Sequence, residues 1–447
     1  MTSKSPQTAT EQPSVKDVDE RARAIYNTLK NALWLPGLEL ARSRQGWLWG
    51  DFWKAGNTLD AAINYIVTVG TPQERADFVR QILEPSFEMF KKLYWPSNPF
   101  HWRDDYGWWG NAFLSAYRYA DRLGIGSDLK EDLLNHAINR CWMVLKESAV
   151  ENWKYEPHQG RTFIGEGYAA WNDHSAHDYE FENGAPREEP EENYQPTPNT
   201  VTNVGFWALS CRLAELVRAE DQPIYLESMK NTADWFIRYA ANNHLMNHVD
   251  LVGECANPEA HRWWCRIYEG RRDRAWTADQ CAFMYCCKKT IQFEPQESER
   301  RKSLTLLYDR LKNGFVKSSN TLVDANGVLL EYDFDPPDKH DDNSSNYNDN
   351  YCTGPGVFMR YLGYLYPMIA HDDPFRKSMS DLISKSADSA WDNRVGDNNI
   401  RLWYSKYLEG TGYFGYYMAA HADGKKLFDF GFQTGALDLY VAMRRLL

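Results

Sequence analysis

The chain has 447 residues, of which 62 are acidic and 50 are basic, so its formal net charge at pH 7 is −12. An acidic chain lacks the basic face that replaces counterions around phosphates, which argues against nucleic acid as a partner and favours an uncharged or cationic small ligand. Hydrophobic residues make up 43% of the chain, enough for a large core, yet no stretch approaches the ~20 apolar residues of a membrane-spanning helix.

The amino-terminal segment is polar and lacks the apolar core of a secretory signal. We expect residues 1–16 to form a disordered tail and residues 17–447 to form one monomeric domain. The eight cysteines show no C-x-x-C pair and no zinc spacing with histidine. This pattern favours a reduced, cytoplasmic protein. The alternative is a secreted protein that has lost its leader, in which Cys255 and Cys265 are candidates for a disulfide.

Apolar residues recur at helical spacing along most of the chain, with little of the β-branched alternation that is typical of strands. The sequence therefore predicts an all-α fold. The twelve expected helices span residues 17–33, 52–70, 72–94, 105–123, 126–147, 200–218, 222–242, 275–293, 296–318, 352–370, 373–390 and 428–446.

The joints between these helices are of two kinds. Short turns with Gly, Asp or Pro, such as residues 70–72 and 124–126, are what antiparallel helix hairpins require. Longer joints, rich in aromatic and acidic residues, lead into residues 200, 275 and 428. This pattern predicts an (α/α)6 toroid of six hairpins, with the long loops around one mouth where a ligand cleft would form. An open superhelix would show a repeat of fixed length, which is absent.

Two adjacent aspartates, Asp104 and Asp105, open one of the expected inner helices within an aromatic run, residues 101–110. Two carboxylates repel if both ionise, so a site that partly buries them separates their pKa values, as an acid/base or acid/nucleophile pair requires. The simpler interpretation is a helix start, with Asp104 as the cap and Asp105 favoured by the helix dipole. Because consecutive residues of a helix diverge by about 100°, a shared cleft requires the pair to lie at or before the first turn.

Comparable residues recur at the start of every expected inner helix. Indole rings stack on the apolar faces of sugars, and Asn, Gln, Asp and Arg supply directional hydrogen bonds for hydroxyl groups. The further candidates are Trp53, Asn57 and Asp60; Tyr106, Trp108 and Trp109; Asn199 and Asn203; Trp276, Asp279 and Gln280; Tyr351 and Arg360; and Gln433. The alternative is that the rings fill the barrel axis and the polar residues cap helices, which is the favoured interpretation for Trp53 and Gln433.

Six segments resemble glycoside hydrolase family 76, in the family's order: residues 51–60, 104–109, 199–203, 276–280, 356–362 and 433–437. The resemblance implies an (α/α)6 barrel and an endo-acting α-1,6-mannanase that retains the anomeric configuration. It also implies that Asp104 is the nucleophile and Asp105 the general acid/base. By the same resemblance Tyr106, Trp108, Trp109, Asn203 and Gln280 line the cleft. Retention requires carboxyl groups ~5–5.5 Å apart, which adjacent side chains can meet if both point into one cleft.

The chain departs from the family pattern in two places. A long loop insertion at about residues 151–198 carries Trp153, Tyr155, Trp171, His174 and His177. Gly354-Pro355 stands where the family usually has Phe-Lys. The identity of the sugar, its linkage and endo or exo action therefore stay open.

Two other segments suggest metal ligands at first sight. The acidic segment 333–342 lacks the Gly and the bidentate Glu of a calcium loop, so a solvated acidic loop is the favoured interpretation. His174, His177 and His340 form only a weak metal-site signal. We therefore predict neither a metal nor another cofactor.

The predicted function is a retaining glycoside hydrolase that cleaves an α-mannosidic or related bond in a small-molecule or oligosaccharide substrate. One alternative is a recruited intracellular metabolite-tailoring enzyme, an acid-catalysed cyclase, isomerase or dehydratase that uses the same Asp pair. No Asp-Asp-x-x-Asp string is present, which counts against a terpene cyclase. A second alternative is a catalytically silent carbohydrate-binding protein.

Overall fold

The structure is a computed structural model, and it describes residues 13–35, 40–41, 52–93, 102–151, 154–155, 163–164, 168–170, 199–241, 276–316, 322–324, 326–329, 353–392, 394 and 430–447. These residues are mainly helical, and every one of the twelve predicted helices is present. The first helix begins at Val15, two residues earlier than predicted, because Ser14 caps it: Ser14 Oγ accepts a hydrogen bond from the Asp17 N–H (3.2 Å).

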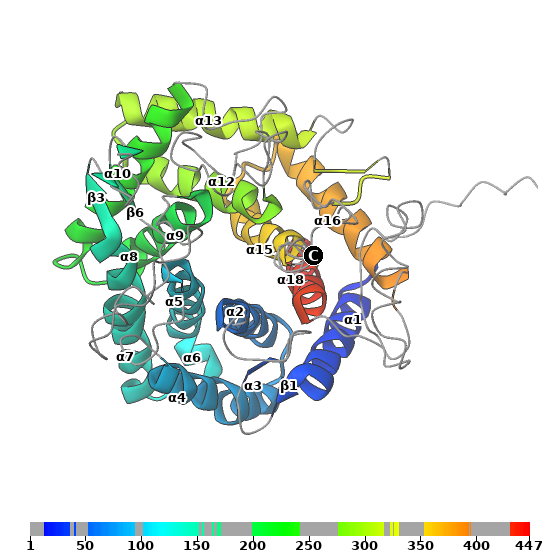
Figure 1. The fold of residues 1–447 in the computed structure, drawn as a ribbon. Coiled ribbons are helices and arrows are strands. Elements are labelled where there is room, and N and C mark those ends of the chain that lie inside the picture. Colours follow the sequence, from blue (N-terminus) through cyan, green and yellow to red (C-terminus); the bar gives the residue numbers. More distant parts are fainter. Residues whose placement is uncertain are drawn as a thin grey trace, which may run out of the picture.

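Six helices form an inner ring in which each helix packs against the next and the last returns to the first (Figure 1). They are α2 (Phe52–Thr68), α5 (Arg103–Arg118), α9 (Thr200–Leu216), α12 (Thr277–Phe293), α15 (Gly354–Leu365) and α18 (Phe430–Leu446). Most residues of α2, α9 and α12 are buried on every side of the helix. Burial all round is expected of a helix that has neighbours on every face.

An outer ring of helices covers the inner ring (Figure 1). It comprises α1 (Val15–Thr28); α3 (Pro72–Phe78) with η2 (Val79–Leu83) and α4 (Glu84–Leu93); α7 (Ser127–His136) with η3 (Ala137–Trp142) and α8 (Met143–Ser148); α10 (Gln222–Ala241); α13 (Glu299–Val316); and α16 (Pro374–Asp392). The first and last helices of the chain meet where α1 of the outer ring packs on α18 of the inner ring: Arg444 Nε donates to Asp19 (2.8 Å), and Gln433 Nε2 donates to the Ile25 carbonyl (3.0 Å). Gln433 thus has a structural contact, in line with its favoured interpretation.

The described strands are short and form three antiparallel pairs. In the first pair β1 (Trp34–Leu35) meets β2 (Leu40–Ala41). The other two pairs, β3 (Ala149–Glu151) with β6 (Tyr168–Ala170) and β4 (Lys154–Tyr155) with β5 (Phe163–Ile164), are nested in sequence. Part of the segment predicted as a loop insertion is therefore a pair of strand ladders, which the weak alternation of its apolar residues did not indicate.

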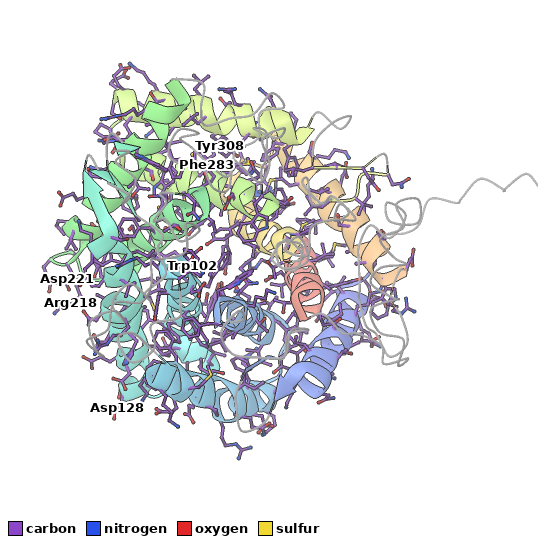
Figure 2. The ribbon with its side chains drawn as sticks, in the orientation of Figure 1. Trp102, Asp128, Arg218, Asp221, Phe283 and Tyr308 are labelled. Atoms are coloured by element: carbon purple, nitrogen blue, oxygen red, sulfur yellow. The ribbon has the colours of Figure 1, made fainter. Side chains whose placement is uncertain are left out.

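The joints from inner to outer helices are short. Between α2 and α3, Thr71 and Glu74 form a capping box: Thr71 Oγ1 accepts the Glu74 N–H (3.2 Å), and the Glu74 carboxylate accepts the Thr71 N–H (2.7 Å). Gly124, with φ 73°, ends α6 (Ala120–Leu123) in the left-handed conformation that favours glycine. Figure 2 shows Arg218 and Asp221 of the α9–α10 joint at the periphery of the ring.

The inner helices are parallel to one another. Residues from the first three turns of α5, α9, α12 and α15 line one cavity, and residues from the last three turns of the same four helices line another. The joints into α5, α9, α12, α15 and α18 therefore all reach the barrel at one mouth, whereas the short joints lie at the other. This confirms the predicted (α/α)6 toroid and the predicted separation of the two kinds of joint.

Many aromatic side chains fill the space between the two rings. Trp142 and Trp207 are buried, and their indole N–H groups donate to Ser210 Oγ and Thr290 Oγ1 (both 2.9 Å). A buried indole normally has such a partner, because an unmet N–H is costly away from water. Much of the aromatic content of the sequence is therefore core rather than binding surface.

Candidate active site

Residues from the first three turns of four inner helices line a cavity of about 20 Å³, which begins at Asp104 in the first turn of α5 and is called here the first-turn cavity. Its polar wall is formed by Asp104, Asn111, Asp279 and Tyr361, and Trp108 lies beside them. This volume is enough for about one water molecule, and a water needs two or more polar partners of the kind this wall contains. The cavity lies at the mouth where the sequence predicted the ligand cleft.

Asp104 and Asp105 are the second and third residues of α5, in its first turn. Asp104 is partly exposed and contributes to the wall of the first-turn cavity. Asp105 is only 5% exposed, and its Oδ2 accepts a hydrogen bond from the Trp102 N–H (3.2 Å). Figure 2 labels Trp102 at the start of α5, inside the ring. Both residues thus lie in the turn that a shared cleft requires, although their surroundings differ.

The surroundings of Asp105 change its affinity for a proton. Burial, and then the negative charge of Asp104, raise the pKa of Asp105 well above its ordinary value, and the hydrogen bond from the Trp102 N–H opposes them. Asp105 therefore holds a proton more strongly than an ordinary aspartate does. A proton-holding carboxyl beside a second carboxyl is the arrangement from which an acid and a nucleophile can be assigned.

The contact between Asp105 and Trp102 is also a helix-capping contact. In a capping box the third residue of the helix accepts a hydrogen bond from the backbone N–H of the cap, which is what Asp105 does here. The simpler interpretation of the pair, a helix start, therefore holds in part, but with Asp105 rather than Asp104 in the capping contact. Asp104 is left facing the first-turn cavity.

Three tryptophans from three inner helices form an aromatic cluster at the same mouth, called here the indole cluster. The ring centroids of Trp53 and Trp108 are 5.5 Å apart, and Trp276 lies 6.2 Å from Trp53 and 6.0 Å from Trp108. Trp53 and Trp108 are partly exposed and pack against the hydrophobic core. The contacts of Trp53 with rings from two other inner helices agree with its favoured interpretation, a ring that fills the barrel axis. Because Trp108 also lines the first-turn cavity, the cluster lies next to Asp104.

Tyr106 and Trp109, expected to line the cleft, are core residues instead. Tyr106 is fully buried against Phe52, and Trp109 is 1% exposed, with its Nε1 donating to the Phe52 carbonyl (2.9 Å). The helical period explains the division: 104, 108 and 111 share one face of α5, whereas 106, 109 and 113 share another. That period was available in the sequence and could have separated the two sets.

The side chains of Asn203 and Gln280, also expected in the cleft, form hydrogen bonds with backbone groups. Asn203 is buried; its Oδ1 accepts the Ala170 N–H (2.8 Å), and its Nδ2 donates to the Ala170 carbonyl (3.0 Å). This pair of bonds attaches strand β6 to α9. Gln280 is buried, and its Nε2 donates to the Trp276 carbonyl (2.9 Å). Asn199 is the cap of α9, because its Oδ1 accepts the Thr202 N–H (3.1 Å).

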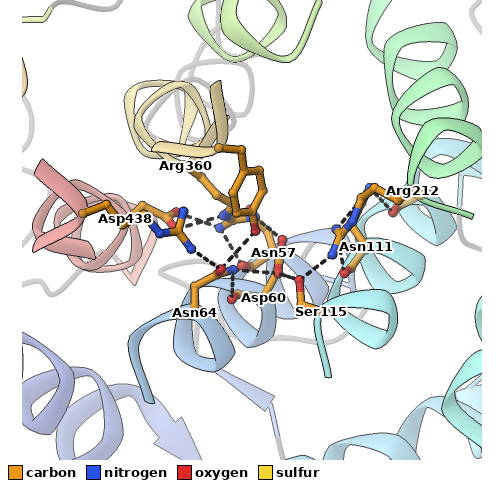
Figure 3. A network of polar contacts seen from close by, with 11 residues as sticks. Asn57, Asp60, Asn64, Asn111, Ser115, Arg212, Arg360 and Asp438 are labelled. Carbon is orange, nitrogen blue, oxygen red and sulfur yellow. Dashed lines mark hydrogen bonds and ion pairs between the residues drawn. The ribbon is translucent and has the colours of Figure 1, made fainter. Parts of the chain in front are cut away.

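Arg360 lies inside the barrel and not in the cleft where it was expected. Its Nε and Nη2 donate to Asp438 (2.9 and 2.7 Å), and its Nη1 donates to Asp60 (2.9 Å), with all three side chains buried (Figure 3). Its Nη2 also donates to the carbonyl of Asn57 (3.0 Å), another predicted ligand. This arginine therefore joins α15 to α2 and α18. A charged residue within the mostly apolar run 434–443 was the signal that could have identified Asp438.

Asp279 is the predicted ligand that joins the aspartate pair. It is the third residue of α12, is 2% exposed, and shares the wall of the first-turn cavity with Asp104. A third carboxyl therefore lies at this mouth. Asp279 and Trp276, the cap residue of α12, place a carboxyl group and an aromatic ring at the start of the same helix, a combination that suits sugar binding.

Several predicted residues lie outside the described part of the chain. They are Tyr351, the acidic segment 333–342, His174, His177 and His340, and Cys255 and Cys265. Within the described ranges, no group of three or more His, Cys, Asp or Glu side chains is placed to hold a metal ion. In the same ranges, no helix has the length and apolar character that crossing a membrane requires.

No family model and no curated protein matches the chain. Solved structures do. An inactive variant of the α-1,6-mannanase GH76A of Salegentibacter sp. HEL1_6, in complex with α-1,6-mannotetrose, has a TM-score of 0.60 and 14% identity over 96% of this chain and 100% of that chain. Dfg5 from Chaetomium thermophilum, in complex with glucosamine, has a TM-score of 0.59 and 14% identity over 98% and 93%. A GH76 α-mannanase of Bacteroides thetaiotaomicron has a TM-score of 0.55 and 12% identity. The chain thus has the six-hairpin fold found in the GH76 enzymes.

Proposed function

We propose that the chain is a retaining glycoside hydrolase that acts on an α-mannosidic or related glycosidic bond. The observation that carries the proposal is the division of labour between two adjacent carboxyls. Asp104 faces the first-turn cavity, and Asp105 is buried with its pKa raised. Retaining glycosidases need a carboxylate that attacks and a second carboxyl that keeps a proton to donate.

In the proposed reaction Asp105 protonates the glycosidic oxygen while the Asp104 carboxylate attacks the anomeric carbon. The bond to the leaving sugar breaks, and a covalent glycosyl ester forms on Asp104. Asp105, now ionised, takes a proton from a water molecule, whose oxygen attacks the anomeric carbon and frees Asp104. Two inversions give net retention, and both carboxyls return to their starting states.

Two further observations support this assignment. The indole cluster presents apolar rings next to Asp104, and such rings stack on the apolar faces of pyranoses. In the mannanase of Salegentibacter, the inactive variants carry substitutions of two consecutive aspartates. Asp104 and Asp105 are consecutive aspartates at the start of an inner helix in the same fold.

The test uses α-1,6-mannotetraose and an array of other α-mannosides, with reducing ends measured and the product anomer followed by NMR. We expect the wild type to release a product of retained configuration, and Asp104→Asn and Asp105→Asn each to lose activity by about 10²-fold or more. Asp128→Asn is the matched control, because Asp128 also lies in the first turn of a helix but is exposed at the periphery of the ring (Figure 2). It should retain full activity.

Other results would favour the alternatives. Full activity in both Asn variants would exclude the assigned roles. Sugar binding that depends on Trp108, without turnover by a folded wild type, would indicate a carbohydrate-binding protein. Conversion of an unglycosylated metabolite that depends on the Asp pair, without release of reducing sugar, would indicate a recruited acid catalyst.

A further inference from the structure

A second cavity lies at the opposite mouth of the barrel, where the inner helices end. Its volume is about 430 Å³, and we call it the last-turn cavity. Five cationic side chains line it: Arg118, Arg212, Lys289, Arg376 and Arg445. It lies at the far end of α5 from Asp104, and the 16 residues of α5 span roughly 24 Å. Neither aspartate of the pair lines this cavity, although its Arg212 donates to Asn111 in the wall of the first-turn cavity.

Two of the five cations share one carboxylate. Arg118 Nη2 donates to Glu215 (2.6 Å), and Lys289 forms an ion pair with the same side chain. The single negative charge of Glu215 therefore pairs with two positive charges at this edge of the cavity.

The other three cations have neutral partners. Arg212 donates to Asn111 Oδ1 (2.8 Å), Arg376 donates to the Ile369 carbonyl (2.7 Å), and Arg445 donates to Asn64 Oδ1 (2.9 Å). Within the described ranges, none of the three guanidinium groups has a carboxylate oxygen within 4.0 Å, although the charge of Asp60 acts on Arg212 and that of Arg445 acts on Asp438 over longer distances. The cavity therefore has an excess of positive charge, although the chain as a whole is acidic.

Arg212 is the most informative of the three, because it is only 3% exposed. Its Nη2 donates to Ser115 Oγ (2.8 Å), and Ser115 Oγ in turn donates to Asp60 (2.5 Å), as Figure 3 shows. Asp60 is already the ion-pair partner of Arg360. Arg212 thus reaches a carboxylate only through a hydroxyl group. A buried guanidinium with neutral partners is costly, and an anion in the adjacent cavity would complete its coordination.

Neutralisation of helix ends does not account for the whole set. Each helix ends in about half a negative charge, and Arg376 caps carbonyls in this way at Tyr366 and Ile369. Arg212, however, lies one turn before the end of α9 and donates to side chains of α5. Its hydrogen bonds therefore join α9 to α5 at the wall of the cavity and do not neutralise the end of its own helix.

Tyrosine rings hold several of these cations in place. The guanidinium carbon of Arg376 lies 4.0 Å from the ring centroid of Tyr366, and that of Arg445 lies 4.9 Å from the ring centroid of Tyr364. Both tyrosines also line the cavity. Stacking of this kind limits the orientations of a guanidinium, so less entropy is lost when it binds an anion.

We propose that the last-turn cavity binds a small phosphate-bearing anion, either inorganic phosphate or a sugar phosphate. Guanidinium groups match phosphate oxygens with two parallel hydrogen bonds, and several of them around one cavity provide for more than one negative charge. A volume of about 430 Å³ lies within the range of small-molecule sites and exceeds what a phosphate group alone would fill. The site makes no use of the aspartate pair.

The test is calorimetric titration of the full chain with inorganic phosphate, with mannose 6-phosphate and with neutral mannose, at constant ionic strength. We expect saturable binding of at least one phosphate compound, unchanged when α-1,6-mannotetraose is present. Comparable affinities for inorganic phosphate and mannose 6-phosphate would point to free phosphate as the ligand. Tighter binding of mannose 6-phosphate would point to a sugar phosphate. Arg445→Gln should weaken binding about tenfold. The matched control is Arg444→Gln, which removes the same charge from the adjacent residue, whose partner is Asp19 on α1.

Arg376→Gln is the second test variant, and circular dichroism checks that each variant is folded. It should also weaken binding about tenfold. Absence of saturable binding by the wild type would overturn the proposal. Equal weakening by Arg444→Gln would also overturn it, because the effect would then be one of overall charge. Competition with the mannotetraose would place the anion at the other mouth.

Discussion

Asp104 and Asp105 are adjacent in one helical turn, yet Asp104 lines a cavity while Asp105 is buried and accepts a hydrogen bond from the backbone of Trp102. The difference follows from the helix itself, because consecutive side chains leave its axis in directions about 100° apart. Burial of one carboxyl next to the other raises the proton affinity of the buried one. Two adjacent aspartates thereby have different surroundings.

Replacement of Asp105 should change the dependence of stability on pH. The folded state raises the pKa of Asp105 above its unfolded value near 4, so folding is favoured at low pH and the stability falls as pH rises through the folded pKa. Asn has no charge to bury and can still accept the Trp102 N–H. We therefore expect the Tm of Asp105→Asn, relative to the wild type, to rise between pH 4 and pH 8. A difference in Tm that stays constant over this range would contradict the raised pKa.

Replacement of Trp109 should mainly lower stability, whereas replacement of its neighbour Trp108 should mainly weaken substrate binding. Trp109→Ala removes a buried ring between Phe52 and Phe90 and should lower the free energy of unfolding by about 3–5 kcal/mol. Trp108→Ala removes a partly exposed ring of the indole cluster, so it should raise KM for the mannotetraose with a smaller loss of stability. Urea denaturation and steady-state kinetics of both variants provide the comparison. Equal losses of stability would show that Trp108 is also core.

Arg360→Met should be strongly destabilising, because it leaves the buried Asp60 and Asp438 without their cation. Breaking a buried ion pair costs about 3–5 kcal/mol. Burial already raises the pKa of Asp438 to about 6 against the opposing effect of Arg360. The matched variant Arg360→Met/Asp60→Asn/Asp438→Asn removes both charges and should recover part of the loss in urea denaturation. No recovery would mean that packing, and not charge, dominates.

Two glycine substitutions should have opposite signs. A Cβ at Gly356 would lie 2.3 Å from the Cα of Gly435, at the contact between α15 and α18, so Gly356→Ala should destabilise the protein by about 1–3 kcal/mol. A Cβ at Gly205 has no atom within 4 Å. Gly205 is inside helix α9, so Gly205→Ala should stabilise the protein by about 0.5–1 kcal/mol. Thermal unfolding of both variants tests this, and a neutral Gly356→Ala would disprove the close approach.

Within the candidate site, the sequence predicted that Asp104 and Asp105 lie in the first turn of an inner helix, which the structure confirms, but it did not indicate all of their neighbours correctly. Asp104, Trp108 and Asp279 meet at one cavity as expected, and Trp53 and Trp276 pack beside them. Tyr106, Trp109, Asn203 and Arg360 were expected there too, and the structure buries them elsewhere. A motif contains residues from several faces of its helix, and only one face can meet the cleft.

The sequence by itself determined the twelve helices, their alternating short and long joints, and hence the toroid. That information is local, because helical periodicity and turn residues act over a few positions. Only the tertiary structure decided which side chains meet. Arg360 finds its carboxylates about 300 and 78 positions away in the chain, and the five cations of the last-turn cavity come from five different helices. Closure of the ring creates these contacts, and no local pattern encodes them.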